Sequence, residues 1–468
     1  MRILRGVIFV LFGAILVFLG PQETFGQQEH RRIEEEARSD LATTETGVER
    51  GDRQWLLDYG AWLNYRYIKY SNDDNDDSTE DLIKKRHWID SRLWMRLALK
   101  PGLEASYENE HYLYLRVKDL MLDDRPEETA GGWDHDGPHL EYAYVNCDMR
   151  PFWLKAGRQY LSAGQGIAFS GVFDGAEIMF LSRSWGVRTF AANTLPHEDN
   201  IDTSVPGYDK ESDRYFYGLE YSYLGFPSQT LYSYAVIQRD ESNERPEDPS
   251  HDYQYNSEYF GVGSRGKIAP EFTYGVEVIK ETGKSVIYDT DEKKDVDAWA
   301  ARFKMTYQPA VYSRPRLFFE YAFGSGDSDR VSVTDTQNGN TSGKDSNFLY
   351  FGYVPSGFAL FPLLSNLHLY RVGVSTRPLE KYRVFKNFSI GVDYYRFYKH
   401  KAGGGIYDPQ ASEDNHDVGS EIDVTLGWRI FSDMGFSIEY GHFMPGKAYP
   451  DSSNDSQDYF SISTTFTF

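Results

Sequence analysis

From Gln54 to its last residue, the chain alternates apolar and polar side chains with a period of two. In RHWIDSRLWMRLALK, residues 86–100, aliphatic side chains share one face of an extended strand and charged side chains share the other. The final segment, YFSISTTFTF, puts mostly Phe and Ile on one face and hydroxyl groups on the other, and it ends on Phe468. The pattern predicts β-strands with one apolar and one polar face.

The connections between the predicted strands alternate in length. We count 18 candidate strands, the third near residues 103–118; long polar connections follow odd-numbered strands, and short turns follow most even-numbered ones. Long outer loops, short periplasmic turns and a final strand that ends on Phe are typical of outer-membrane barrels. The sequence therefore predicts an all-β fold, a single transmembrane antiparallel β-barrel of about 18 strands over residues 54–468.

One long connection, residues 324–364, differs from the others because it contains the apolar stretch FGYVPSGFALFPLL. Such a stretch is costly to expose to water. We expect this connection to fold inward against the lumen or the rim of the barrel.

The first 53 residues do not follow the strand pattern. Arg2 and Arg5 precede an apolar run from Val7 to Leu19, and small residues end at Gly26, which predicts a signal peptide over residues 1–26. Residues 27–53 are charged and poor in large apolar side chains, so we expect a periplasmic leader there.

Composition narrows the class further. Polar residues interrupt every later apolar stretch and the mean hydropathy is −0.58, which excludes a helical membrane protein. Aromatic residues make up 16% of the chain, as suits the aromatic girdles of a barrel. The single cysteine, Cys147, rules out an internal disulfide, and the net charge of −22 argues against nucleic-acid binding. The predicted location is the cell outer membrane, with membrane lipid as a partner.

Strand alternation points a set of cations toward the lumen. The predicted pore-lining residues are Arg92, Arg96, Arg158, Arg188, Arg302, Lys304, Arg371 and Arg429. Arg158 is the exception to simple alternation, which would place it beside Leu154 on the lipid face. A lipid-facing arginine near mid-membrane costs roughly 2–4 kcal/mol, so we predict a β-bulge near Gly157 that turns Arg158 inward.

Acidic side chains share the predicted lumen face with these cations. The acidic partners are Asp90, Glu141, Glu177, Glu320, Glu421 and Asp423. Two interpretations stay open: the arginines brace the wall by pairing with carboxylates, or they contact a solute. A lumen with both signs of charge could also pass neutral or cationic solutes.

Three segments resemble the alginate export (alginate porin) family of 18-stranded outer-membrane barrels. They are LKAGRQYLSAGQGIAFSGVFDGAEI at residues 154–178, EYAFGSGDSD at residues 320–329 and VGSEIDVTLGWRIFSDMGFSIEYGHFMPGKAY at residues 418–449. The resemblance implies passive export of an anionic uronate polysaccharide such as alginate past an inward arginine cluster. Guanidinium suits that role because it stays charged and can bind a carboxylate with two parallel hydrogen bonds. The expected partners are an anionic polysaccharide or another small anionic solute, and periplasmic secretion components.

Other chemistry is poorly supported. A general or small-solute porin remains the alternative function. The acidic loops GSGDSD and SNDDNDD lack the Gly and terminal Glu of an EF-hand loop, and the histidines form no HExxH pattern. No G-x-S-x-G elbow is present. We therefore expect no metal, no cofactor and no enzymatic activity.

Overall fold

The computed structural model describes residues 55–72, 75, 85–99, 111–125, 132–195, 213–241, 255–286, 292–330, 333–334 and 340–468. The predicted signal peptide (1–26) and leader (27–53) lie outside these residues, as do most of the acidic loop at 72–84 and the long connections near 199 and 248. Within the described part of the chain, no helix is long and apolar enough to span a membrane.

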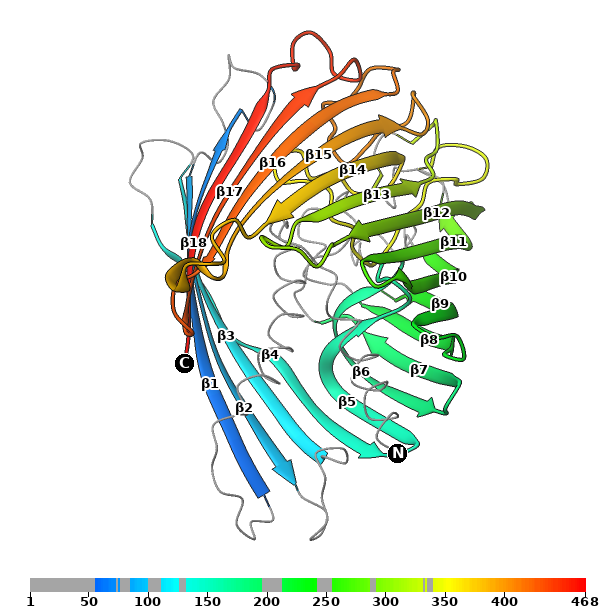
Figure 1. Ribbon diagram of the computed structural model, residues 1–468. Helices are drawn as coiled ribbons and strands as arrows, with labels where there is room; N and C mark the ends of the chain where they lie inside the picture. Colours follow the sequence, from blue (N-terminus) through cyan, green and yellow to red (C-terminus); the bar gives the residue numbers. More distant parts are fainter. Residues whose placement is uncertain are drawn as a thin grey trace.

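The described residues form 18 antiparallel strands (Figure 1). In the first half these are β1 (Trp55–Ser71), β2 (Lys85–Leu99), β3 (His111–Arg125), β4 (Asp134–Met149), β5 (Phe152–Ser162), β6 (Ser170–Leu181), β7 (Trp185–Asn193), β8 (Arg214–Tyr223) and β9 (Gln229–Asp240). In the second half they are β10 (Asn256–Ala269), β11 (Phe272–Val286), β12 (Lys293–Tyr307), β13 (Arg316–Gly324), β14 (Leu367–Thr376), β15 (Phe388–Lys399), β16 (Asp417–Arg429), β17 (Met434–Pro445) and β18 (Gln457–Thr467). A 3-10 turn, η5 (Arg383–Phe385), lies between β14 and β15.

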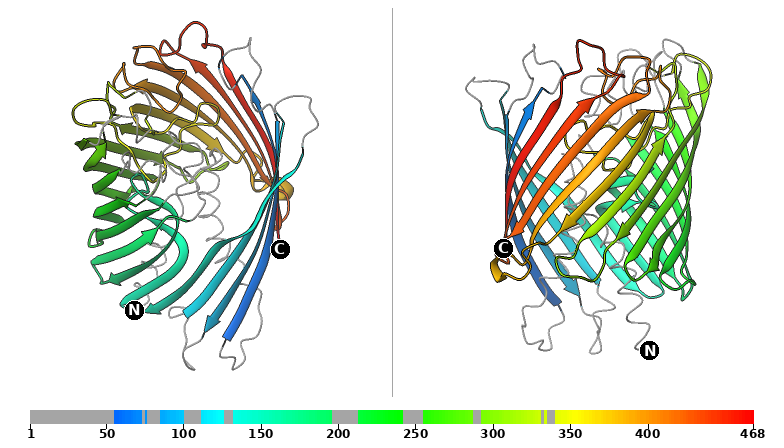
Figure 2. Two further views of the ribbon diagram at one scale, coloured as in Figure 1. Left: turned by 180° about the vertical axis from the view of Figure 1, so that it is seen from behind. Right: turned by 45° about the horizontal axis from the view of Figure 1, so that its top comes forward.

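The sheet closes on itself through its first and last strands. Each strand pairs with its neighbours in sequence, and β1 pairs with β18 from Trp62–Thr467 to Ser71–Asp458. Phe468 and Ala61 exchange two backbone hydrogen bonds, at 2.9 and 3.1 Å. The strands run obliquely around the wall (Figure 2). The predicted closed 18-stranded barrel is confirmed, and the C-terminal segment is the strand that closes it.

The two faces of the strands differ as the alternation predicted. Large apolar side chains such as Leu93, Val262 and Val372 are 55–66% exposed on the outer face, where lipid surrounds the barrel. Charged side chains such as Arg92, Glu281 and Glu320 are buried on the inner face.

Strand boundaries show where the prediction was wrong. The third strand, predicted near 103–118, runs from His111 to Arg125. The long polar connection expected after residue 118 begins later, because Leu120 and Asp123 are buried in the continuing strand. The strand therefore continues past Asp119, although charged residues interrupt its apolar content.

The β5–β6 hairpin leaves the wall partway along its length. β5 pairs with β4 only as far as Arg158–Ala143, but it pairs with β6 up to Ser162–Ser170. Gly157, where β5 bends, has a φ of +121°, and a Cβ there would overlap the carbonyl oxygen of Ala143. The strand β5 curves toward the barrel interior (Figure 1).

Candidate functional site

Two connections enter the barrel and meet there. The short insert, residues 163–169, joins β5 to β6, and the long insert, residues 325–366, joins β13 to β14. Phe351 donates its N–H to Ala168 O at 2.9 Å and accepts from Ser170 N at 3.0 Å, while Tyr353 N donates to Gly166 O at 2.8 Å. Phe169 and Phe348 are fully buried in one apolar cluster that spans both inserts. The prediction that the apolar connection folds inward is confirmed.

Four glutamates of the barrel wall hold these inserts, and we call them the carboxylate wall. They are Glu220 on β8, Glu277 and Glu281 on β11, and Glu421 on β16. Glu421 accepts the backbone N–H groups of Phe358, Ala359 and Leu360 at 2.6, 2.7 and 3.0 Å. Charge-assisted hydrogen bonds of this kind are about twice as strong as neutral ones. Glu421 thus anchors the C-terminal part of the long insert, at residues 358–360.

The other carboxylate-wall residues act in the same way. Glu277 accepts from Gln165 N at 2.6 Å and from two tyrosine hydroxyls. Glu281 accepts from Leu349 N at 3.0 Å, and Glu220 accepts from Gly164 N at 3.2 Å. Both inserts are therefore held by carboxyl oxygens on the inner face of the barrel.

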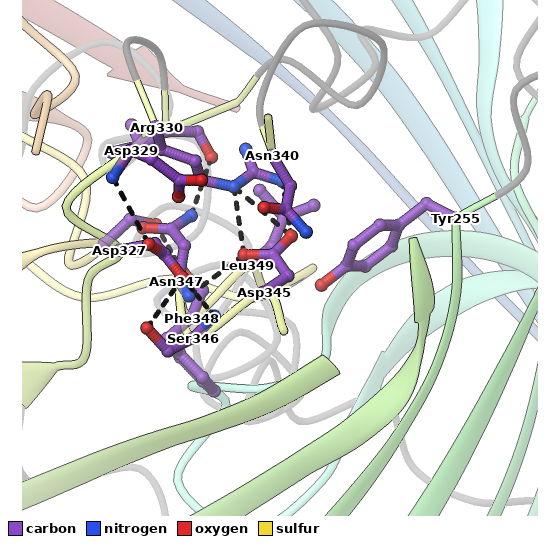
Figure 3. A network of polar contacts seen from close by, with 12 residues as sticks. Tyr255, Asp327, Asp329, Arg330, Asn340, Asp345, Ser346, Asn347, Phe348 and Leu349 are labelled. Atoms are coloured by element: carbon purple, nitrogen blue, oxygen red, sulfur yellow. Dashed lines mark hydrogen bonds and ion pairs between the residues drawn. The ribbon is translucent and has the colours of Figure 1, made fainter. Parts of the chain in front are cut away.

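The long insert also has an internal polar framework (Figure 3). Arg330 pairs with Asp345 at 2.7 Å, and both side chains are buried. Asp327 accepts from Ser346 N and Oγ at 2.8 and 2.9 Å. Burial opposes ionisation of Asp327, but hydrogen bonds from Asp329 and Ser346 bring its pKa below the ordinary value. Burial and the adjacent Asp327 carboxylate raise the pKa of Asp329.

Strands β2 to β5 present a different inner surface, and we call four of its cations the arginine wall: Arg92, Arg96, Arg116 and Lys155. Arg92 lies 3.2 Å from Asp90 and 3.0 Å from Glu141. Arg116 shares Glu141 at 2.6 Å. Arg96 lies 3.6 Å from Asp58. The three arginines thus pair with carboxylates of their own strand or of strands one or two places away.

Each cation of the arginine wall also lies over an aromatic ring. Arg92 lies 5.0 Å from the Trp62 ring centre, Arg96 4.7 Å from Tyr112, Arg116 4.2 Å from Tyr142 and Lys155 4.2 Å from Tyr144. Tyr114 stacks between Trp94, at 6.3 Å, and Tyr144, at 5.2 Å. A cation over a ring gains about 0.5–2 kcal/mol. The rings therefore help to fix where these charges lie.

The remaining predicted lumen cations form two further groups. Arg302 pairs with Glu320; Arg371 pairs with Asp393 at 2.7 Å and lies 3.8 Å from Glu320. Lys304 lies directly across from Glu320 in the β12–β13 register. Arg188 lies 3.0 Å from Glu220 and 3.5 Å from Glu177, and it donates to the Ser162 carbonyl. The solute-contact role predicted for these residues stays a prediction.

Arg158 contradicts the predicted inward bulge. The registers of β5 with β4 and β6 continue through Gly157 without a shift, so Arg158 stays on the outer face. There it binds Asp174 with two hydrogen bonds of 2.9 Å and donates to Leu140 O at 2.8 Å. The energetic cost expected for a lipid-facing arginine applies to an unpaired charge. Arg158 is paired with Asp174, so that cost does not apply in full.

Three other predicted residues lie apart from the arginine pairs. Arg429 is exposed at the β16–β17 turn and donates to the Ser432 carbonyl. Glu421, expected to pair with an arginine, holds the long insert instead. Asp423 lies across from Asp393, and none of the described cations lies within ion-pairing distance of it.

The sequence interpretation also missed functional candidates. Lys155 lies on the inner face and was not expected there, whereas the alternation in LYLRV does place Arg116 on the charged inner face, although Arg116 was not among the predicted pore-lining residues. Glu277 and Glu281 were identifiable as inward by the same rule, but no local signal indicated that they hold inserts. In the described residues, no group of three or more His, Cys, Asp or Glu side chains is arranged to hold a metal ion.

Comparisons with known proteins agree with this architecture. A family model described as alginate export matches residues 63–462. No curated protein matches the sequence. Pseudomonas aeruginosa OccK8 (OprE) shares 14% identity at a TM-score of 0.53, covering 88% of this chain and 98% of that chain. Acinetobacter baumannii OccAB4 shares 14% identity at a TM-score of 0.51, covering 90% of this chain and 100% of that chain. P. aeruginosa OpdK, solved with vanillate, shares 11% identity at a TM-score of 0.53, covering 88% of this chain and 98% of that chain. At these identities the likeness shows the barrel fold alone.

Proposed function

The chain belongs to the alginate export family, and we propose that its outer-membrane barrel passes an anionic polysaccharide such as alginate out of the periplasm. The arginine wall carries this proposal. Arg92, Arg96 and Arg116 lie on adjacent strands of the inner face, so their charges form a continuous band. A uronate chain has one carboxylate on each sugar, and a band of cations lets it move from one to the next without a single tight site.

Wall carboxylates support the alternative of a general or small-solute porin. Asp58, Asp90 and Glu141 lie within ion-pairing distance of these arginines and reduce the net positive charge. The inserts also narrow the space within the barrel. Both features suit smaller anions, such as single carboxylate-bearing molecules, as well as a polymer.

The sign of the selected ion tests the proposal. We expect the wild-type channel to prefer anions in planar bilayers under a salt gradient, despite a whole-chain charge of −22. Permeation depends on charges near the pathway more than on outer loops, which salt screens within about 8–10 Å. Preference for anions, together with current block by uronate oligosaccharides, supports polysaccharide export. Anion preference without such block favours the small-solute alternative, and cation preference overturns the proposal.

A channel for a periplasmic polymer also needs partners that supply the polymer. We propose that periplasmic secretion components deliver the polymer to the periplasmic turns of the barrel. The proposal assigns no chemical step to the chain and requires no cofactor.

A further inference from the structure

Lys155 differs from the other cations of the arginine wall in how its charge is satisfied. The strand registers place it between Asn146 of β4 and Glu177 of β6, on the inner face. Its ammonium lies 4.2 Å from the centre of the Tyr144 ring. Among the described residues, no carboxylate lies within ion-pairing distance of the ammonium and no acceptor forms a hydrogen bond with it. Its three N–H donors are therefore available to a molecule in the lumen.

The nearest carboxylate in the register is already engaged. Glu177 lies across from Lys155 but lies 3.5 Å from Arg188. Arg188 in turn lies 3.0 Å from Glu220 and donates to the carbonyl of Ser162, next to the short insert. Arg188 is thus committed to holding the wall and the insert together, whereas Lys155 is half-buried on the inner face and lies over the Tyr144 ring.

Lys155 also lies on the periplasmic side of the short insert. β5 begins at Phe152, directly after the periplasmic turn at Arg150 and Pro151, and it reaches the short insert after Ser162. Lys155 is near the first of these ends. An anion that enters from the periplasm therefore meets Lys155 before it meets the inserts.

We propose that Lys155 is an anion-binding residue at the periplasmic entrance, which binds a carboxylate group of the passing uronate sugar. This assignment rests on the proposed function and deepens it. The ammonium is a compact point charge that accepts a carboxylate from many angles, which suits capture of a moving chain. The face of Tyr144 stabilises the cation without neutralising it, so its charge stays available to the solute.

Current block by defined sugars tests this assignment on the full-length channel. We would add trigalacturonate, a uronate trisaccharide, to the side that the periplasmic turns face, and use neutral maltotriose as the uncharged match. Lys155→Gln and Lys155→Met both remove the charge, and Met also keeps an unbranched side chain over Tyr144. Each variant should weaken current block by trigalacturonate about tenfold. Block by maltotriose should not change, and Lys155→Arg should retain most of the affinity.

A matched control removes the same charge elsewhere. Lys280 pairs with Asp297 and lies over Trp299 on the outer face, so Lys280→Gln should leave block unchanged. Reduced gel mobility on heating would show that each variant is folded. Trigalacturonate block that is equal in wild type, Lys155→Met and Lys155→Gln would overturn the Lys155 assignment alone. A wild-type channel that trigalacturonate does not block would overturn the proposed polysaccharide function together with it.

Discussion

The arginine wall and the carboxylate wall lie in one barrel, yet their charges are satisfied by different kinds of group. The arginines pair with carboxylate side chains of their own or nearby strands, as Arg116 does with Glu141 at 2.6 Å. The glutamates of the carboxylate wall accept backbone N–H groups from the inserts, as Glu421 does from three consecutive residues. In these two regions, therefore, the arginines brace the wall, whereas the four glutamates hold the inserts.

This difference follows from donor and acceptor chemistry. An ionised carboxylate only accepts hydrogen bonds, and successive backbone N–H groups supply donors that it can gather. A guanidinium only donates, so it can hold the backbone of a loop only through its carbonyl groups. Arg188 and Arg265 do this once each, at Ser162 O and Gly164 O. Much of the negative charge on the inner face is thus used to hold the inserts, so net charge is a poor guide to selectivity.

Glu421→Gln should produce the largest effect, because it removes the charged anchor of the long insert. Gln retains one carbonyl acceptor where the carboxylate had two oxygens and a charge. Losing at least one charge-assisted hydrogen bond costs about 1.5–3 kcal/mol, which shifts the docked-to-undocked equilibrium by roughly 10- to 100-fold. Single-channel recording should therefore show long-lived states of higher conductance.

Glu439→Gln is the matched control for this loop release. Glu439 lies on the neighbouring strand β17 and pairs with Arg66 at 2.7 Å, so its loss removes the same charge. It should leave the conductance states close to wild type. Equal conductance changes in both variants would show that the wall charge, and not the anchoring of the insert, controls the channel.

Substitutions in the arginine wall should change the ion selectivity of the channel and not the position of the inserts. Replacing Arg96 and Arg116 together by Gln should lower the anion-to-cation permeability ratio about threefold for each charge, from interactions on the order of 0.6 kcal/mol. Replacement of both by Lys should keep the sign of selectivity but weaken uronate block, because Lys lacks the planar fork. Reversal potentials measured in a salt gradient report the first effect, and sugar block reports the second.

Arg396, on the outer face of the barrel, provides the control for the arginine-wall variants. Arg396 pairs with Asp417 at 2.6 Å, and by alternation it shares the outer face with Tyr394, which is 46% exposed. Arg396→Gln should leave the reversal potential unchanged at physiological salt. An unchanged reversal potential in the Arg96 and Arg116 double variant as well would mean that these arginines only brace the wall.

The features that could be predicted from the sequence are those set by the alternation of side chains along each strand. Alternation within each strand predicts the number of strands and the inward direction of Arg92. It also predicts that the segment ending at Phe468 closes the barrel. The direction of Arg158 was predicted wrongly, because a local energy argument overlooked Asp174 on the next strand. The role of Glu421 was also out of reach, because Phe358 lies 63 residues away in the chain. Only the folded long insert brings that backbone to the carboxylate.

The smallest expected effect is a pH dependence confined to the long insert. Asp329 has a raised pKa because burial and the neighbouring Asp327 disfavour its charge. A raised pKa means that the folded insert binds this proton more tightly than the unfolded chain does. The stabilisation is therefore fully present below the unfolded pKa of Asp329 and is lost as the pH rises through the raised folded value. Because the pair is partly exposed, we expect protease nicking of the long insert to be only about twofold faster at pH 7.5 than at a pH below the unfolded aspartate pKa of about 3.9. Asp329→Asn mimics the protonated acid at every pH and should remove this difference, whereas Glu421→Gln should raise nicking at both pH values. A pH dependence that persists unchanged in Asp329→Asn would show that the sensitive group is not Asp329.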